Sequence, residues 1–194
     1  MEMNKKLLIE LIYPQNARLI IEGKTPDGRT ILKGKLQEAD VKNGNGRVYP
    51  KSILEQKVTS YRDRFVKNRT SLGELDHPES QIVNLQNASH IITEIWWNGN
   101  DVLGKIELLP TPSGKIAQAI VESNIPLGIS SRAMGSVKQI GENVEVQDDL
   151  EFVCWDLVSN PSTPNAFMGL NENINYQNEQ YKKLNRIISE ILYS

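Results

Sequence analysis

The sequence is poor in cysteine, in histidine and in net charge. Its 194 residues include one cysteine, Cys154, and two histidines, His77 and His90, and the formal net charge is -2. A single cysteine excludes an intramolecular disulfide framework and a zinc-finger-like cluster, and is typical of a reducing compartment. A nearly balanced charge gives no electrostatic attraction to nucleic acid or to an anionic membrane surface. We therefore expect neither nucleic acid nor a membrane among the partners.

Long apolar runs are missing as well. No stretch approaches the ~18 apolar residues that would span a bilayer. The N-terminal segment 1–15 has basic residues before apolar ones, but its apolar run contains Glu10 and stops at Tyr13-Pro14, too short for a secretory signal. We therefore expect a cytoplasmic protein. Hydrophobic residues make up 39% and charged residues 24% of the chain, which is typical of one soluble domain with a sizeable core.

The hydrophobic pattern predicts more strands than helices. Strands are expected at 18–23, 30–40, 82–97, 102–109, 136–140, 143–147 and 150–158, with turns at 24–29 and 98–101 closing two hairpins. One helix begins at Pro50, because Leu54, Val58, Tyr61 and Phe65 recur at helical spacing. A shorter helix is expected at 115–123, with Ser113 available as its cap.

The C-terminal end differs in composition from the rest of the chain. Residues 169–180 are rich in Asn, Gln and Glu with little to bury, which predicts a flexible connector. Tyr181, Leu184, Ile188 and Ile191 then follow at helical spacing and predict an amphipathic tail helix. We therefore expect a domain over 1–168, followed by a connector and helix over 169–194.

Two short stretches contain residues suited to nucleophilic chemistry. In "PLGISSRAMGSV" (126–137), Ser130 and Ser131 precede Arg132 and lie among small residues. Such a segment can form a tight turn that aims backbone N–H groups at one point, as an oxyanion hole requires, although an ordinary turn is commoner. A serine needs a base, and His77 in "GELDHPES" (73–80) could supply one.

A third group must hold the imidazole in the correct tautomer. Asp156 is the best candidate, because it interrupts the apolar run 152–158 and a carboxylate there is costly unless it is paired. The alternative is a strand-edge carboxylate that faces water. Glu74 and Asp76 are poorer candidates, because close sequence neighbours of His77 tend to point away from its ring.

Several blocks of sequence together resemble a known family. In order, they are "LQEADVKNGNGRVYPKSILE", "LGELDHPES", "IWWNGNDVLGK", "IPLGISSRAMGS" and "DLVSNPSTPNA". They look like the prohead core proteases of contractile-tailed phages of the T-even type, over roughly residues 30 to 168. The resemblance implies an α+β fold: a small, mostly antiparallel β-barrel flanked by helices, similar to the herpesvirus assemblins.

The resemblance also implies roles for individual residues. The family's serine endopeptidase mechanism would use Ser130 as nucleophile, His77 as base and Asp156 as the third member. Assemblins use a second histidine in that third role, and here no histidine follows His90. The amide of Ser131 or Arg132 would hold the oxyanion. The Arg132 side chain would brace its loop, unless it is an ordinary solvated charge.

Substrates, location and assembly are further implications of the resemblance. The family cleaves scaffold, core and capsid proteins inside the prohead, in the host bacterial cytoplasm, and then digests itself. Its members generally cut after glutamate with an aliphatic residue two positions earlier, as in "LNE" ending at Glu172 and "ISE" ending at Glu190. These are candidate self-cleavage sites, although the tail helix could instead pack on its own domain or on a neighbour. We expect a homo-oligomeric ring, in the family's manner a hexamer.

Three rival interpretations remain open. Glu74, Asp76, His77 and His90 could bind a metal, although their spacing matches no ligand motif, so we expect no metal and no cofactor. Cys154 could be the nucleophile, although cysteines flanked by Val and Trp are usually inert. The chain could also be a catalytically inactive capsid-core structural protein of the same fold. Against this last alternative, all three proposed catalytic positions hold competent residues.

Overall fold

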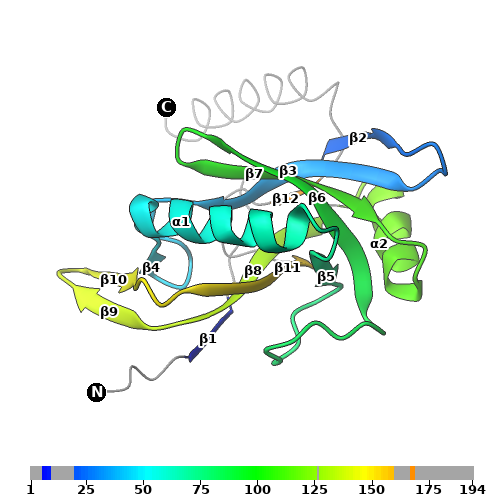
Figure 1. The fold of residues 1–194 in the computed structure, drawn as a ribbon. Helices are drawn as coiled ribbons and strands as arrows, with labels where there is room; N and C mark the ends of the chain where they lie inside the picture. Colours follow the sequence, from blue (N-terminus) through cyan, green and yellow to red (C-terminus); the bar gives the residue numbers. More distant parts are fainter. Residues whose placement is uncertain (1–5, 10–19, 126, 160–166, 169–194) are drawn as a thin grey trace, which may run out of the picture.

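The computed structural model describes residues 6–9, 20–125, 127–159 and 167–168 (Figure 1). The helical elements are α1 (Lys51–Tyr61), a π-helical turn η1 (Arg62–Val66) that continues it, and α2 (Pro112–Glu122). The strands are β1 (Lys6–Ile9), β2 (Ile20–Lys24), β3 (Thr30–Glu38), β4 (Arg47–Val48), β5 (Leu72–Glu74), β6 (Ala88–Asn98), β7 (Asp101–Leu108), β8 (Leu127–Gly135), β9 (Val137–Ile140), β10 (Asn143–Val146), β11 (Glu151–Val158) and β12 (Phe167–Met168).

Most strands belong to one large sheet with the order β1-β8-β12-β3-β7-β6-β5. β2 adds to β3, and β11 pairs with β8 along the edge opposite β1 and β12. A smaller sheet has the order β4-β10-β9. Both expected hairpins, β2–β3 and β6–β7, are present and antiparallel. The predicted α+β class with mostly antiparallel strands is confirmed.

The expected closed barrel is wrong, because the large sheet stays open. Its outer strands β5 and β11 approach each other, but in the described part of the chain their backbones share only an isolated parallel bridge, Leu75 to Leu157, and a 2.7 Å bond from the Asp76 amide to the Leu157 carbonyl. A closed barrel needs a continuous ladder between these strands. β5 cannot provide one, because it has three residues and Asp76 then adopts a φ of 71°, which turns the backbone away.

The helix expected from Pro50 is confirmed, and it lies across one face of the large sheet (Figure 1). Its buried residue Tyr61 meets Trp155 of β11 edge-on, with ring centroids 4.9 Å apart, and Trp155 stacks on Phe152 at 4.4 Å. A register shift between Phe152 and Cys154 lets both aromatic rings point to this side. The next residue along β11, Asp156, consequently points to the other face of the sheet.

Two element starts differ most from expectation. The strand expected from residue 82 begins at Ala88, and the preceding loop leaves Ile82 and Leu85 exposed at 74% and 71%. Helix α2 is capped by Thr111 rather than Ser113, because Pro112 occupies the first helical position and the Thr111 hydroxyl accepts the Gly114 amide at 3.1 Å. Neither difference changes the order of the elements.

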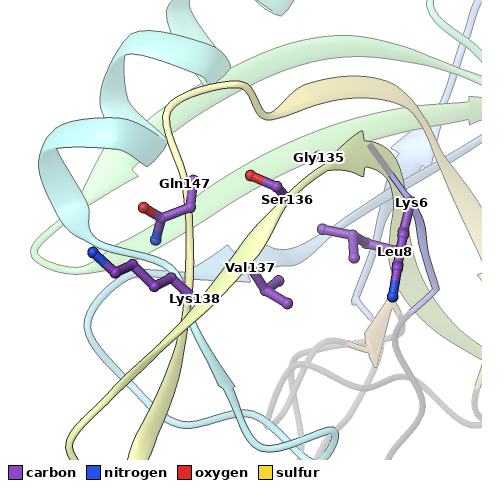
Figure 2. A pocket seen from close by; sticks show the side chains of 7 residues that line it. All are labelled: Lys6, Leu8, Gly135, Ser136, Val137, Lys138 and Gln147. Carbon is purple, nitrogen blue, oxygen red and sulfur yellow. The ribbon is translucent and has the colours of Figure 1, made fainter. Parts of the chain in front are cut away.

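A shallow hollow of about 330 Å³ lies where β1 meets the end of β8 (Figure 2). Its lining residues are Lys6, Leu8, Gly135, Ser136, Val137, Lys138 and Gln147. No helix in the described part of the chain is long and apolar enough to cross a membrane. The connector and tail expected over 169–194, with Glu172 and Glu190, lie outside the described residues.

Candidate active site

The two serines lie in strand β8, and the expected tight turn at 126–137 is wrong. β8 pairs with β11 along almost its whole length, and its opposite edge pairs with β12 at Leu127 and Gly128 and with β1 from Arg132 to Gly135. Ladder hydrogen bonds on both edges favour an extended backbone over the turn that small residues also permit. In this register Ser130 lies directly opposite Asp156.

Strand alternation separates the roles of Ser130 and Ser131. Ser130 shares its face of the sheet with Asp156, whereas Ser131 lies opposite Trp155 and points toward the aromatic core. There the Ser131 hydroxyl accepts a 3.2 Å hydrogen bond from the Gln37 side chain. Only Ser130 is therefore on the side where the His77 and Asp156 side chains meet.

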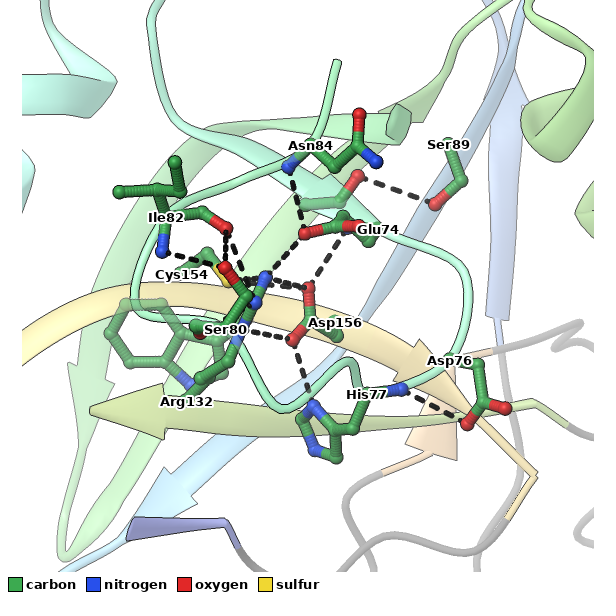
Figure 3. A network of polar contacts seen from close by, with 12 residues as sticks. Glu74, Asp76, His77, Ser80, Ile82, Asn84, Ser89, Arg132, Cys154 and Asp156 are labelled. Carbon is green, nitrogen blue, oxygen red and sulfur yellow. Dashed lines mark hydrogen bonds and ion pairs between the residues drawn. The ribbon is translucent and has the colours of Figure 1, made fainter. Parts of the chain in front are cut away.

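His77 is placed by the turn that ends β5 (Figure 3). The left-handed backbone of Asp76 turns the chain, and the Asp76 carboxylate accepts the His77 amide at 2.9 Å. The His77 ring then lies with Nδ1 2.8 Å from Asp156 Oδ2. A carboxylate can only accept at this contact, so Nδ1 carries the proton and Nε2 presents its lone pair. Nε2 is buried and has no hydrogen-bond partner in the described part of the chain.

Gly73 allows β5 to come this close to β11. A Cβ at this position would lie 2.1 Å from the Trp155 carbonyl oxygen and 2.4 Å from the His90 ring. His90 is fully buried, with Nε2 3.1 Å from the same carbonyl and Nδ1 2.9 Å from the Ser89 hydroxyl. His90 is thus a structural imidazole that supports the β5–β11 contact.

Asp156 receives hydrogen bonds on both carboxylate oxygens. Burial would raise its pKa, but the His77 hydrogen bond, the Arg132 charge and the Glu74 amide, which donates at 2.9 Å, together hold the pKa below its ordinary value. Asp156 is therefore ionised at neutral pH. It faces the site rather than water, which excludes the alternative of a solvated strand-edge carboxylate.

Arg132 is fully buried, which excludes an ordinary solvated charge. Its Nη2 donates to Glu74 Oε1 at 2.7 Å, and its Nε lies 3.0 Å from Asp156 Oδ2 as an ion contact that is not aligned for a hydrogen bond. Its Nη1 donates to the Ser80 carbonyl at 2.9 Å and is 3.4 Å from the Ile82 carbonyl. The loop that Arg132 braces is thus the one after His77 (Figure 3).

The geometry also bears on the two rival chemistries. In the described part of the chain, no three His, Cys, Asp or Glu side chains gather as a metal site would require. The Cys154 thiol is buried and donates to Asp156 Oδ1 at 3.2 Å. Burial, followed by the Asp156 charge, raises the pKa of this thiol well above its ordinary value, so it stays protonated and is a poor nucleophile.

Sequence reasoning missed the importance of Gly73 and Glu74. Glu74 is fully buried against Arg132, whereas the sequence indicated for it only the roles of orienting group or metal ligand. A usable signal was present, because a buried arginine between apolar strands needs an anionic partner. The hollow of Figure 2 lies elsewhere: Gly135 follows Ser130 by five residues on β8, which is about 17 Å along a strand.

Acid is expected to destabilise the fold through His90. Burial lowers the pKa of His90 from 6.5 to about 4, so between these values the unfolded chain binds a proton that the folded chain does not. The stability from this group is present above pH 6.5 and is lost as the pH falls toward 4. We expect about 2 kcal/mol less free energy of unfolding from His90 at pH 5 than at pH 7, measured by denaturant titration.

The matched variant for this measurement is His90→Gln, whose amide can still donate to Trp155 and accept from Ser89. Its free energy of unfolding should change less between pH 7 and pH 5 than that of the wild type, by about the same 2 kcal/mol. Equal losses in the two proteins would show that His90 is protonated within the folded state.

Comparisons with known proteins identify the family to which this chain is similar. A family model described as "Prohead core protein serine protease" matches residues 13–178. The prohead core protein protease of Enterobacteria phage T4 is 37% identical over 142 residues, which cover 71% of this chain and 66% of that protein, slightly less than two thirds of its length. The solved structure of the bacteriophage T4 capsid assembly protease matches with a TM-score of 0.70 at 31% identity, covering 79% of this chain and 98% of that chain.

Proposed function

The chain belongs to the prohead core protein serine protease family, and from that premise we propose that it is a serine endopeptidase of phage head maturation. The observation that carries this proposal is the 2.8 Å contact between His77 Nδ1 and Asp156 Oδ2, with Ser130 directly opposite Asp156 in the sheet. These contacts support the proposal, because acyl transfer by a serine needs a base, an orienting carboxylate and a nucleophile within reach of one another.

In the proposed mechanism, His77 Nε2 takes the proton of Ser130 as Oγ attacks the scissile carbonyl carbon. The resulting imidazolium is stabilised by Asp156, and it then gives the proton to the leaving amine. Water, activated by the same imidazole, hydrolyses the acyl-enzyme and regenerates Ser130. The reaction requires a hydrogen bond between Ser130 Oγ and His77 Nε2, and such bonds often tighten only when substrate is bound.

A backbone amide next to the nucleophile is the proposed oxyanion donor. Arg132 pairs with Ile9 of β1. On the same edge of β8, residues 129–131 pair with neither β1 nor β12 in the described part of the chain. This favours the Ser131 amide over that of Arg132. Such a donor is worth about 3 kcal/mol of transition-state stabilisation in other serine proteases.

The proposed substrates are scaffold, core and capsid proteins inside the prohead, in the host bacterial cytoplasm. Support comes from the printed names of the two T4 relatives, a prohead core protein protease and a capsid assembly protease. We also propose cleavage after glutamate and assembly into a homo-oligomeric ring of six subunits. These finer assignments rest on the family resemblance.

Self-processing at Glu172 and Glu190 is part of this proposal. Both glutamates follow an aliphatic residue two positions earlier, and the segment around Glu172 is polar. Mass spectrometry of protein that is digesting other substrates should show chains ending at one of these residues. An intact C-terminus in such a sample would remove self-processing from the proposal.

Covalent labelling tests the proposed activity. A fluorophosphonate should modify the native protein at Ser130, and peptide mapping distinguishes this residue from Ser131. Labelling and cleavage should both survive a metal chelator and a thiol alkylator. A protein that is neither labelled nor active, free or assembled, would favour the alternative of an inactive capsid-core structural protein.

A further inference from the structure

A second buried carboxylate lies next to the proposed triad and has no role in the mechanism above. Glu74 is fully buried, and its Oε1 accepts from Arg132 Nη2 at 2.7 Å and from the Asn84 amide at 3.0 Å. Its Oε2 is buried without a hydrogen-bond partner in the described part of the chain. A buried carboxylate with one unpaired oxygen is costly, so its presence calls for an explanation.

Glu74, Arg132 and Asp156 form one continuous charge cluster. Arg132 lies between the two carboxylates, 2.7 Å from Glu74 and 3.0 Å from Asp156. His77 Nδ1 contacts Asp156 Oδ2, which is the same oxygen that Arg132 Nε contacts. One cation and two anions give this cluster a net charge of about -1 before His77 is protonated.

The other titratable groups around the cluster are neutral near pH 7 or lie toward solvent. The Cys154 thiol of β11 and the Tyr61 phenol of α1 are protonated, because burial raises the pKa of each. His90 of β6 stays neutral, because burial lowers its pKa to about 4. In the turn after β5, the Asp76 and Glu79 side chains are exposed.

Arg132 alone would counteract the orienting carboxylate. A neutral Arg132–Asp156 pair would offer little net attraction to the imidazolium that forms when His77 takes the serine proton. Glu74 offsets the arginine charge, so that the cluster as a whole becomes neutral when His77 is protonated. We propose that Glu74 is a positioning residue that keeps the surroundings of His77 anionic by neutralising Arg132.

This inference rests on the proposed role of His77 as the base, and it differs from a purely structural role. Glu74 and Arg132 also fix the loop after His77, through the Asn84 amide and the Ser80 carbonyl. If they only fixed this loop, removing either would loosen it in the same way. The charge argument instead requires that the two removals affect His77 in opposite directions.

The test follows the ring signals of His77 by NMR through a pH titration, in a Ser130→Ala background that prevents self-digestion. Glu74→Gln should move the midpoint of the His77 titration down by about one pH unit, and Arg132→Gln should move it up. Glu79→Gln is the matched control, since it removes the same charge from the exposed part of the loop, where water weakens its effect, and should move the midpoint by much less than Glu74→Gln.

Activity gives a second measure in proteins that keep Ser130. Glu74→Gln should lower kcat by up to about tenfold with KM little changed, and should move the acid limb of the pH–rate profile to lower pH. Glu74→Asp keeps the charge and should restore the wild-type profile. A lower kcat with little change in KM is expected because Glu74 acts on the imidazolium of the transition state rather than on substrate binding.

Midpoints that move in the same direction, or by less than about 0.3 pH unit, would overturn the inference. If one variant fails to fold, the direction in which the midpoint moves in the other variant decides. Unfolding of both would assign the pair to the fold alone and would also overturn it. The NMR titration needs no cleavage, so its failure is distinct from failure of the proposed protease function, which would appear as an inert wild type.

Discussion

Ser130→Ala is expected to lower the rate of substrate cleavage by about 10⁶-fold, whereas Ser131→Ala should keep most of the activity. The reason is strand alternation: Ser130 is on the Asp156 face of β8, and Ser131 points into the core toward Gln37. Steady-state cleavage of core or capsid protein, followed by gel electrophoresis, measures both variants.

Ser131→Ala is also the matched control for this experiment, because it removes the same hydroxyl one residue away. It loses the 3.2 Å bond from Gln37, so a stability loss of about 1 kcal/mol is expected without a loss of chemistry. An inactive Ser131 variant beside an active Ser130 variant would make Ser131 the nucleophile. The substrate peptide would then have to reach the opposite face of β8.

Asp156→Asn is expected to lower kcat by about 10⁴-fold in a folded protein. Oδ1 of Asp156 accepts from the Glu74 amide and the Cys154 thiol, so the asparagine oxygen would keep that position and its NH₂ would face His77. Nδ1 must then accept, which forces the imidazole proton onto Nε2. An Nε2 that carries a proton cannot take one from Ser130.

The matched control is Asp148→Asn, which makes the same change at an exposed carboxylate before β11. Circular dichroism and thermal unfolding show whether Asp156→Asn remains folded, because Arg132 loses part of its counter-charge. Activity within tenfold of the wild type would mean that Asp156 does not set the tautomer of His77, and that the third member of the site is another group.

Local patterns predicted the parts of the fold that depend on local physics. The helical spacing of Leu54, Val58 and Tyr61 defined α1, and turn-rich segments between apolar runs defined the β2–β3 and β6–β7 hairpins. The apolar surroundings of Asp156 indicated a carboxylate that had to be paired, and its 2.8 Å contact with His77 agrees with that expectation. In each case the signal lies within a few neighbouring residues.

The remaining features depend on distant partners. Whether the Ser-Ser-Arg segment forms a turn or a strand is decided by the ladders on both edges of β8, which the segment itself does not contain. The role of Glu74 depends on Arg132, 58 residues later in the chain. Whether the sheet closes into a barrel depends on the length of β5. This strand is short because of the turn at Asp76 and because of its approach to β11.

Gly73 limits which substitutions this chain can accept in evolution. Any replacement would bring a Cβ within 2.4 Å of the His90 ring and 2.1 Å of the Trp155 carbonyl oxygen. The ring and the carbonyl are both fixed in a close-packed interior, so neither can yield on its own. A replacement of Gly73 would be tolerated only together with a smaller side chain at position 90 and a shift of β11. A single mutation cannot supply both changes.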